Sequence, residues 1–199
     1  SFEKYLGNGG GYLALTGFFK HLTDFVDPNN SVLYDFSPLL SALTPAQRAI
    51  VVAQNAHIGL VSSPKNTGRG DILGVEATAS LPFTVFSQAL DGFGIFATGT
   101  YVDSKIRYAN NVTPITLPGQ SKWVATGTAY FEKNGFQARA TYRWRDSFLA
   151  ELAGLSANPE YRLGRPEGVL DAQIGYEFRS GPLSGLSILA QAKNLTDQP

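Results

Sequence analysis

An alternating strand that follows a two-residue turn constrains this chain more than any other feature. Over residues 136–145, apolar and polar side chains alternate without a break. The apolar set is Phe136, Ala138, Ala140, Tyr142 and Trp144, and the polar set is Gln137, Arg139, Thr141, Arg143 and Arg145. Successive side chains of a strand point to opposite faces, so one face is apolar and the other carries three arginines. Asn134-Gly135 just before it predicts a tight hairpin, because both residues tolerate positive φ.

The same alternation recurs along the chain and predicts about seven strands. They cover residues 11–26, 70–82, 92–107, 121–132, 136–146, 169–179 and 186–195. The connections between them are alternately long and short, which is typical of outer-membrane barrels with long extracellular loops and short periplasmic turns. Several of these strands reach the roughly 9–11 residues that cross lipid at a tilt, whereas soluble sheets usually have strands of about 5–6 residues.

The composition agrees with a barrel that has lipid around its outer face and water along its inner face. Only 16% of the residues are charged, against about 25% in average soluble proteins. The formal net charge is zero, so nothing in the electrostatics favours nucleic acid as a partner. No apolar run reaches the ~18 residues of a membrane helix, but a membrane β-barrel escapes that criterion, because half of each strand is polar.

Aromatic residues gather near the ends of the predicted strands. Those beside the short turns are Phe131, Phe136 and Phe178, and those toward the long loops are Tyr101, Trp123, Tyr142 and Trp144. Two such bands are typical of the girdles at both membrane interfaces.

The first long connection, residues 27–66, contains a helix signal. Thr44-Pro45-Ala46-Gln47 supplies an N-cap, a proline in the first turn and a capping-box glutamine, which predicts a short helix to about Asn55. Seven strands would leave the sheet unfinished, because single-chain bacterial barrels have an even number of strands. We therefore expect either a further strand, within residues 1–10 or 50–62, or a chain that is a piece of something larger.

Several segments resemble the C-terminal barrel region of TonB-dependent outer-membrane receptors, and their order and spacing make the combination more specific than any one of them. The segments are Glu3-Lys4-Tyr5-Leu6-Gly7-Asn8, Tyr101-Val102-Asp103-Ser104, Leu117-Pro118-Gly119-Gln120-Ser121-Lys122, residues 129–136 with Arg139, Tyr142-Arg143-Trp144-Arg145-Asp146, Leu170-Asp171-Ala172 and Asn194-Leu195-Thr196-Asp197. The resemblance implies an all-β fold: an antiparallel transmembrane β-barrel segment of about seven to eight meandering strands with long extracellular loops.

The resemblance also implies a function. Members of the family are active importers whose barrel of about 22 strands encloses a plug. They take up a scarce nutrient, such as a siderophore, cobalamin or an oligosaccharide, across the bacterial outer membrane with energy from TonB. We expect residues 1–199 to be the C-terminal portion of such a barrel, without the plug, the early strands, the final strand and the TonB-binding region. An isolated fragment would then need detergent, a partner chain or assembly into a closed oligomer, because lipid-exposed sheet edges have no hydrogen-bond partners.

Six residues are candidates for ligand binding. Arg139, Arg143 and Arg145 on the polar face are able to attract an anionic ligand, although such ladders of charge are more typical of a solvated inner face that neutralises itself with residues such as Asp171 and Glu177. The aromatic residues Tyr34, Phe36 and Tyr161 in the long loops are able to stack on sugars or chelates, although loop aromatics more often pack onto the barrel rim.

No pattern predicts an enzyme, a cofactor or a metal site. The only histidines, His21 and His57, are far apart and lack metal-ligand spacing, and there is no Gly-x-Ser-x-Gly elbow. Two alternatives to the transporter remain. A small passive outer-membrane barrel would require an even number of strands that close on themselves, and a soluble β-sandwich binding module would require two apolar sheet faces that meet.

Overall fold

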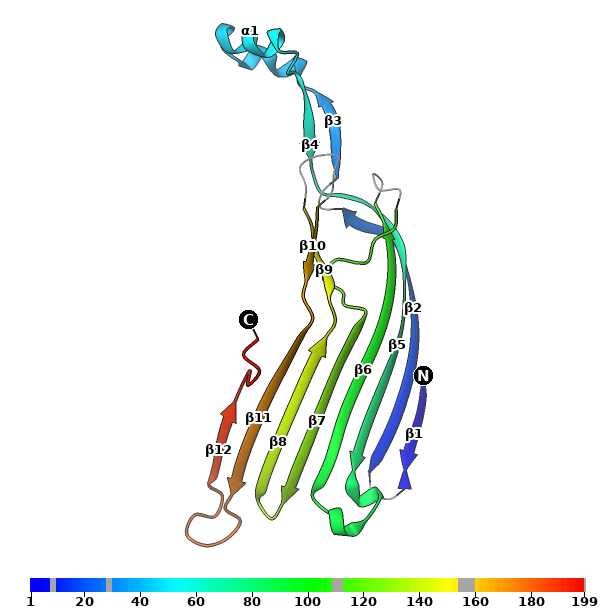
Figure 1. Ribbon diagram of the computed structural model, residues 1–199, viewed down its shortest axis with the longest axis vertical. Helices are drawn as coiled ribbons and strands as arrows, with labels where there is room; N and C mark the ends of the chain where they lie inside the picture. Colours follow the sequence, from blue (N-terminus) through cyan, green and yellow to red (C-terminus); the bar gives the residue numbers. More distant parts are fainter. Residues whose placement is uncertain (8–9, 28–29, 109–112, 154–159, 199) are drawn as a thin grey trace.

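The chain forms one curved antiparallel sheet of eight strands (Figure 1). The computed structural model describes residues 1–7, 10–27, 30–108, 113–153 and 160–198. The strands follow one another across the sheet in sequence order: β1 (Phe2–Leu6), β2 (Gly11–Asp27), β5 (Lys65–Pro82), β6 (Phe93–Arg107), β7 (Trp123–Lys133), β8 (Phe136–Arg145), β11 (Glu167–Glu177) and β12 (Ser187–Ala192). The sheet is open, with β1 and β12 at its two edges. Short turns lie at its lower end and the long connections at its upper end.

All seven predicted strands are present, and an eighth, β1, lies within residues 1–10. β1 pairs with the start of β2, from Leu6 opposite Gly11 to Phe2 opposite Leu15. Its five residues place Lys4 on the same side as the leucines of β2, which hides the alternation in the sequence. β5 begins at Lys65, five residues before the predicted start, because its first residues continue to pair with the far end of β2.

The first long connection forms a separate arm, which we define as residues 31–62. It contains a two-stranded hairpin and two helical segments: β3 (Ser31–Asp35), η2 (Ser37–Ala42), α1 (Pro45–Ala53) and β4 (Ile58–Ser62). The predicted helix is confirmed with its capping box: Gln47 N donates to Thr44 Oγ1 at 3.4 Å, and Thr44 N donates to Gln47 Oε1 at 3.1 Å. Figure 1 shows the arm standing beyond the upper end of the sheet.

The other connections also contain ordered elements. Residues 147–167, predicted only as a loop, contain a second hairpin of β9 (Phe148–Ala153) and β10 (Glu160–Gly164). The turn between β5 and β6 contains η3 (Phe83–Val85) and η4 (Gln88–Leu90). No helix among the described residues is long and apolar enough to cross a membrane.

The sheet has two faces of opposite character. We call the side of Ala138, Ala140 and Tyr142 the apolar face and the side of Arg139 and Arg143 the polar face. The described residues form no second layer over the apolar face, where large side chains such as Phe19 and Leu73 are 64% and 56% exposed. The facing sheets of a β-sandwich are therefore absent from the described part of the chain.

The described apolar residues that are buried form one small cluster at the upper end of the polar face. It consists of Ile106, Tyr108, Ile115 and Leu149, with Leu22, Phe25 and Leu117 packed against it. Ile106 and Ile115 exchange two backbone hydrogen bonds of 2.8 Å, so the β6–β7 connection folds back onto β6. This cluster fixes the connections at that end of the sheet.

Candidate functional site

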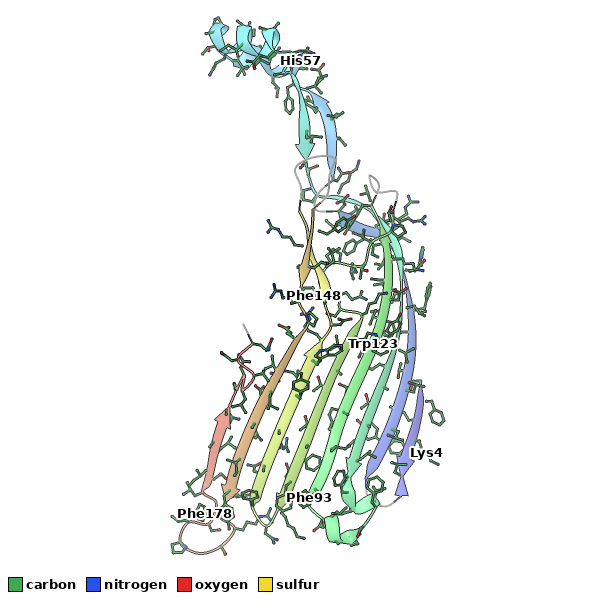
Figure 2. All side chains as sticks on the ribbon, viewed as in Figure 1. Lys4, His57, Phe93, Trp123, Phe148 and Phe178 are labelled. Atoms are coloured by element: carbon green, nitrogen blue, oxygen red, sulfur yellow. The ribbon has the colours of Figure 1, made fainter. Side chains whose placement is uncertain are left out.

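The apolar face carries a band of limited height between two rows of aromatic rings. At the short-turn end the rings of Phe93 and Phe131 lie 4.4 Å apart between centroids, and at the other end Tyr101 and Trp123 lie 4.7 Å apart. Figure 2 shows Phe93 and Phe178 at the lower end of the sheet and Trp123 well above them. The band covers nine residues of β6, from Phe93 in one row to Tyr101 in the other, which matches the roughly 9–11 residues of a strand that crosses a membrane.

Charged pairs lie beyond the aromatic rows on the same side of the strands. Lys133 pairs with Asp91 at 3.3 Å at the short-turn end, and Lys122 pairs with Asp103 at 3.2 Å at the other. The cross-strand rows between them contain only apolar side chains and glycine: Ile95 opposite Ala129, Ala97 opposite Gly127, and Gly99 opposite Ala125. An apolar band with aromatic borders and charges outside is the pattern of a lipid-facing surface.

On the polar face, two of the three predicted arginines form close, hydrogen-bonded ion pairs with neighbouring strands. Arg139 Nε donates to Glu132 Oε1 at 2.9 Å, and a second nitrogen of Arg139 also contacts that oxygen. Arg143 Nη2 donates to Asp171 Oδ2 at 2.6 Å, and Asp171 Oδ1 accepts a bond of 2.8 Å from the backbone N–H of Asn194. These pairs join β7, β8, β11 and the segment after β12.

A shallow pocket of about 260 Å³ opens above these pairs. Its walls are mainly polar and come from four strands and the residue after β12. They are Thr128, Arg139, Thr141, Arg143, Asp171, Ala172, Gln173, Gln191, Ala192 and Lys193. Thr128 and Thr141 are hydrogen-bonded at 2.9 Å, and Gln191 donates to Gln173 at 3.3 Å. With their side chains about half exposed, Arg139 and Arg143 present donors to this space while they remain paired.

Arg145, the third predicted arginine, holds the connections in place. Its Nε donates to Ser121 Oγ and its Nη2 donates to the carbonyl of Gly119, both at 3.2 Å. Its Nη1 lies 3.8 Å from Glu167, and its guanidinium stacks 3.8 Å from the centroid of the Phe148 ring. Arg145 thus joins the β6–β7 connection, β9 and β11.

The predicted aromatic residues lie on separate elements beyond the upper end of the sheet, away from the arginines. Tyr34 and Phe36 are neighbours on the arm, in edge-to-face contact at 4.9 Å, and Phe36 packs over Gly59. Tyr34 is 43% exposed, and Tyr161, on β10, is 53% exposed. Beside them, hydrogen bonds from the side chain and the backbone of Ser37 hold the pKa of Asp35 below its usual value.

Two residues at this site, Glu132 and Lys193, are not among those predicted from the sequence. The hairpin register reveals Glu132, because a turn at Asn134-Gly135 places positions 132 and 139 on the same side of neighbouring strands. No pattern in the sequence points to Lys193, which depends on where β12 ends. Neither histidine joins a metal cluster: His21 Nδ1 contacts Asp71 Oδ1 at 2.7 Å, and no group of three metal-type ligands occurs among the described residues.

Comparison with known proteins identifies the family. One solved structure with a similar fold is that of the ferric citrate transporter FecA in the unliganded form, with a TM-score of 0.56 and 19% sequence identity; the match covers 68% of this chain and 20% of that one. The chain thus matches about a fifth of the length of that transporter. A comparison with curated proteins gave no match. A model of the β-barrel described as "TonB dependent receptor-like" matches residues 1–195, and the chain therefore belongs to the TonB-dependent receptor β-barrel family.

Proposed function

We propose that these eight strands form one side of the barrel of a transporter in the bacterial outer membrane, which takes up a scarce nutrient with energy from TonB. The family match over residues 1–195 and the nine-residue apolar band together carry this proposal. The open edges of the sheet also support a larger barrel, because unpaired backbone groups are unstable in hydrocarbon. The plug and the TonB contact would lie outside these 199 residues.

In a closed barrel the apolar face would meet lipid, and the polar face would line the lumen. We propose that Arg139 and Arg143 contact anionic groups of the nutrient as it passes, because each directs donors into the shared pocket. Tyr34, Phe36 and Tyr161 would make the first contacts outside the barrel. A siderophore, cobalamin or an oligosaccharide remains a candidate nutrient, and the similar fold of a ferric citrate transporter supports an anionic ferric chelate among these. Arg145 would support the loops instead of binding the nutrient.

Uptake in a deletion strain tests this proposal. The gene is deleted in strains with and without functional TonB, and uptake of labelled ferric chelates, cobalamin and maltooligosaccharides is compared with that of the parent. We expect one nutrient class to lose high-affinity uptake both on deletion of the gene and on loss of TonB. Gene-dependent uptake that persists without TonB would instead support a passive barrel, and recovery of the protein in the soluble fraction would contradict a membrane location.

A further inference from the structure

β5 and β6 continue beyond the upper aromatic row and carry an unusual set of charges there. Figure 1 shows both strands extending above the upper end of β7, where that strand begins, and Figure 2 places Trp123 well below the upper ends of β5 and β6. Their pairing runs without a register shift from Pro82 opposite Gly94 to Arg69 opposite Arg107. The side of the strands that bears Tyr101 within the apolar band therefore bears Lys105 and Arg107 above it.

Two like charges face each other in this extension. Arg69 lies directly opposite Arg107, and the next pair on the same face is Asp71 opposite Lys105. Like charges directly opposite each other destabilise an antiparallel pair. An arrangement of this kind is more easily retained where an anion is shared between the two cations.

Two of the three acidic groups nearby are engaged with other partners. Asp71 contacts His21 at 2.7 Å, and Asp103 contacts Lys122 at 3.2 Å. Asp24 is exposed in the irregular stretch of β2 opposite this end of β5. None of the ion pairs between described residues includes Asp24, Arg69, Lys105 or Arg107, and all three cations are exposed.

The opposite face of the extension is tightly packed, so the cations are held at fixed spacing. Ile106, between Lys105 and Arg107, has no exposed surface and belongs to the buried cluster. Gly70 lies so close to β6 that a Cβ placed there would come within 2.2 Å of the carbonyl oxygen of Lys105. The two strands therefore resist separation, which would otherwise relieve the repulsion between Arg69 and Arg107.

We propose that Arg69, Lys105 and Arg107 bind phosphate groups on the head of an anionic glycolipid, whose acyl chains lie on the apolar band below. This inference rests on the proposed location in the outer membrane. The band and the cations share one face of continuous strands, so one molecule is able to touch both. Cations next to a membrane surface attract anionic lipid heads. The surface points away from the lumen, which separates it from the nutrient pathway.

The distance of the three cations from the apolar band indicates how large the lipid head group is. Lys105 and Arg107 are four and six residues beyond Tyr101, or about 13 and 20 Å along the strand, and roughly three-quarters of that along the membrane normal at a tilt of about 40°. The polar zone of a phospholipid bilayer is only about 5–8 Å deep on each side. A phosphorylated saccharide head reaches these positions, whereas the head of an ordinary phospholipid falls short of Arg107.

A binding experiment on the protein purified from outer membranes in detergent tests the proposal. Fluorescent rough-type lipopolysaccharide is titrated against the wild type, the R69Q/K105Q/R107Q variant and an Arg179→Gln control. Arg179 is an exposed cation just after β11, at the short-turn end. Each unpaired cation near a membrane surface is worth about a fivefold change in affinity, so the triple variant should raise Kd at least tenfold, on the order of a hundredfold if the effects add. The control should stay within about twofold, and heat-modified migration on gels verifies folding.

Several outcomes would overturn the proposal. They are an unchanged Kd in the triple variant, an equal loss in the control, equal affinity for phosphatidylglycerol, and displacement of the lipid by 10 mM inorganic phosphate, which would indicate a site for free anions. If the protein inserts into the membrane and imports its nutrient but does not bind the glycolipid, this inference alone is contradicted. A soluble protein would contradict the proposed function as well.

Discussion

The two faces of β6, β7 and β8 belong to the same strands but differ in where charged side chains occur and what they contact. On the apolar face of β6 and β7 the rows between the aromatic rings contain only small or aliphatic side chains, and charged groups begin only beyond those rings. On the polar face, charged side chains recur along β8, and both Arg139 and Arg143 contact a carboxylate on a neighbouring strand. The apolar face is therefore defined by the absence of charged side chains between its aromatic rings, and the polar face by ion pairs between neighbouring strands.

This difference predicts the largest effect for a charge placed on the apolar face. Ala97 lies midway between Phe93 and Tyr101, and Thr98, the next residue, points to the polar face. Ala97→Arg should destabilise the membrane-inserted protein by about 2–4 kcal/mol, the cost of an arginine at mid-bilayer depth. Thr98→Arg on the same strand should have little effect. Urea unfolding of both variants in phospholipid vesicles measures this, and equal losses would contradict the assignment of the faces.

The next effect concerns glycines, whose surroundings also differ between the two faces. On the polar face the Phe18 ring covers Gly74, where a Cβ would come within 2.3 Å of the ring, whereas Gly17 on the apolar face has no atom within 4 Å of its Cβ position. Gly74→Ala should cost about 1–3 kcal/mol, because the ring must move. Gly17→Ala should be neutral or slightly stabilising, because glycine weakens a strand.

The same unfolding assay, with circular dichroism to verify the sheet, compares these two variants. Stability unchanged in Gly74→Ala would show that Phe18 moves away freely. The cover over Gly74 would then be incidental to the packing of β2 on β5.

The strands and faces could be predicted because side-chain alternation is local. β7, β8 and β11 were predicted to within two residues, and the Asn134-Gly135 turn fixed the register that pairs Arg139 with Glu132. β1 could be predicted only as one of two alternatives, a further strand within residues 1–10 or 50–62, because Lys4 interrupts its apolar face at a sheet edge. The role of Arg145 was missed, because its partners Ser121 and Gly119 belong to a connection whose path depends on contacts with β6 and β9.

The ion pairs of the polar face should give a smaller effect than the changes above. Asp171 accepts hydrogen bonds from both Arg143 and the backbone of Asn194, whereas among the described residues the Arg143 side chain donates to Asp171 alone. Removing the carboxylate also leaves the Arg143 charge unpaired. Asp171→Ala should therefore lower the urea midpoint more than Arg143→Ala, since an exposed ion pair alone contributes little. The reverse order would mean that the bond to Asn194 is unimportant.

The arm provides the smallest effect on the stability of the sheet, because the contacts of its helix lie within the arm itself. Thr44 caps α1, and Arg48 Nε donates to the Leu40 carbonyl at 2.9 Å, so the helix is held by residues of the arm. Thr44→Ala should weaken α1 by about 1 kcal/mol, the usual cost of losing an N-cap, and leave the stability of the sheet unchanged. Amide hydrogen exchange distinguishes the two regions: exchange should become faster in α1 and stay the same in β6 and β7. Faster exchange in those strands would show that the arm and the sheet unfold together, and the contrast between a membrane wall and an independent external arm would then fail.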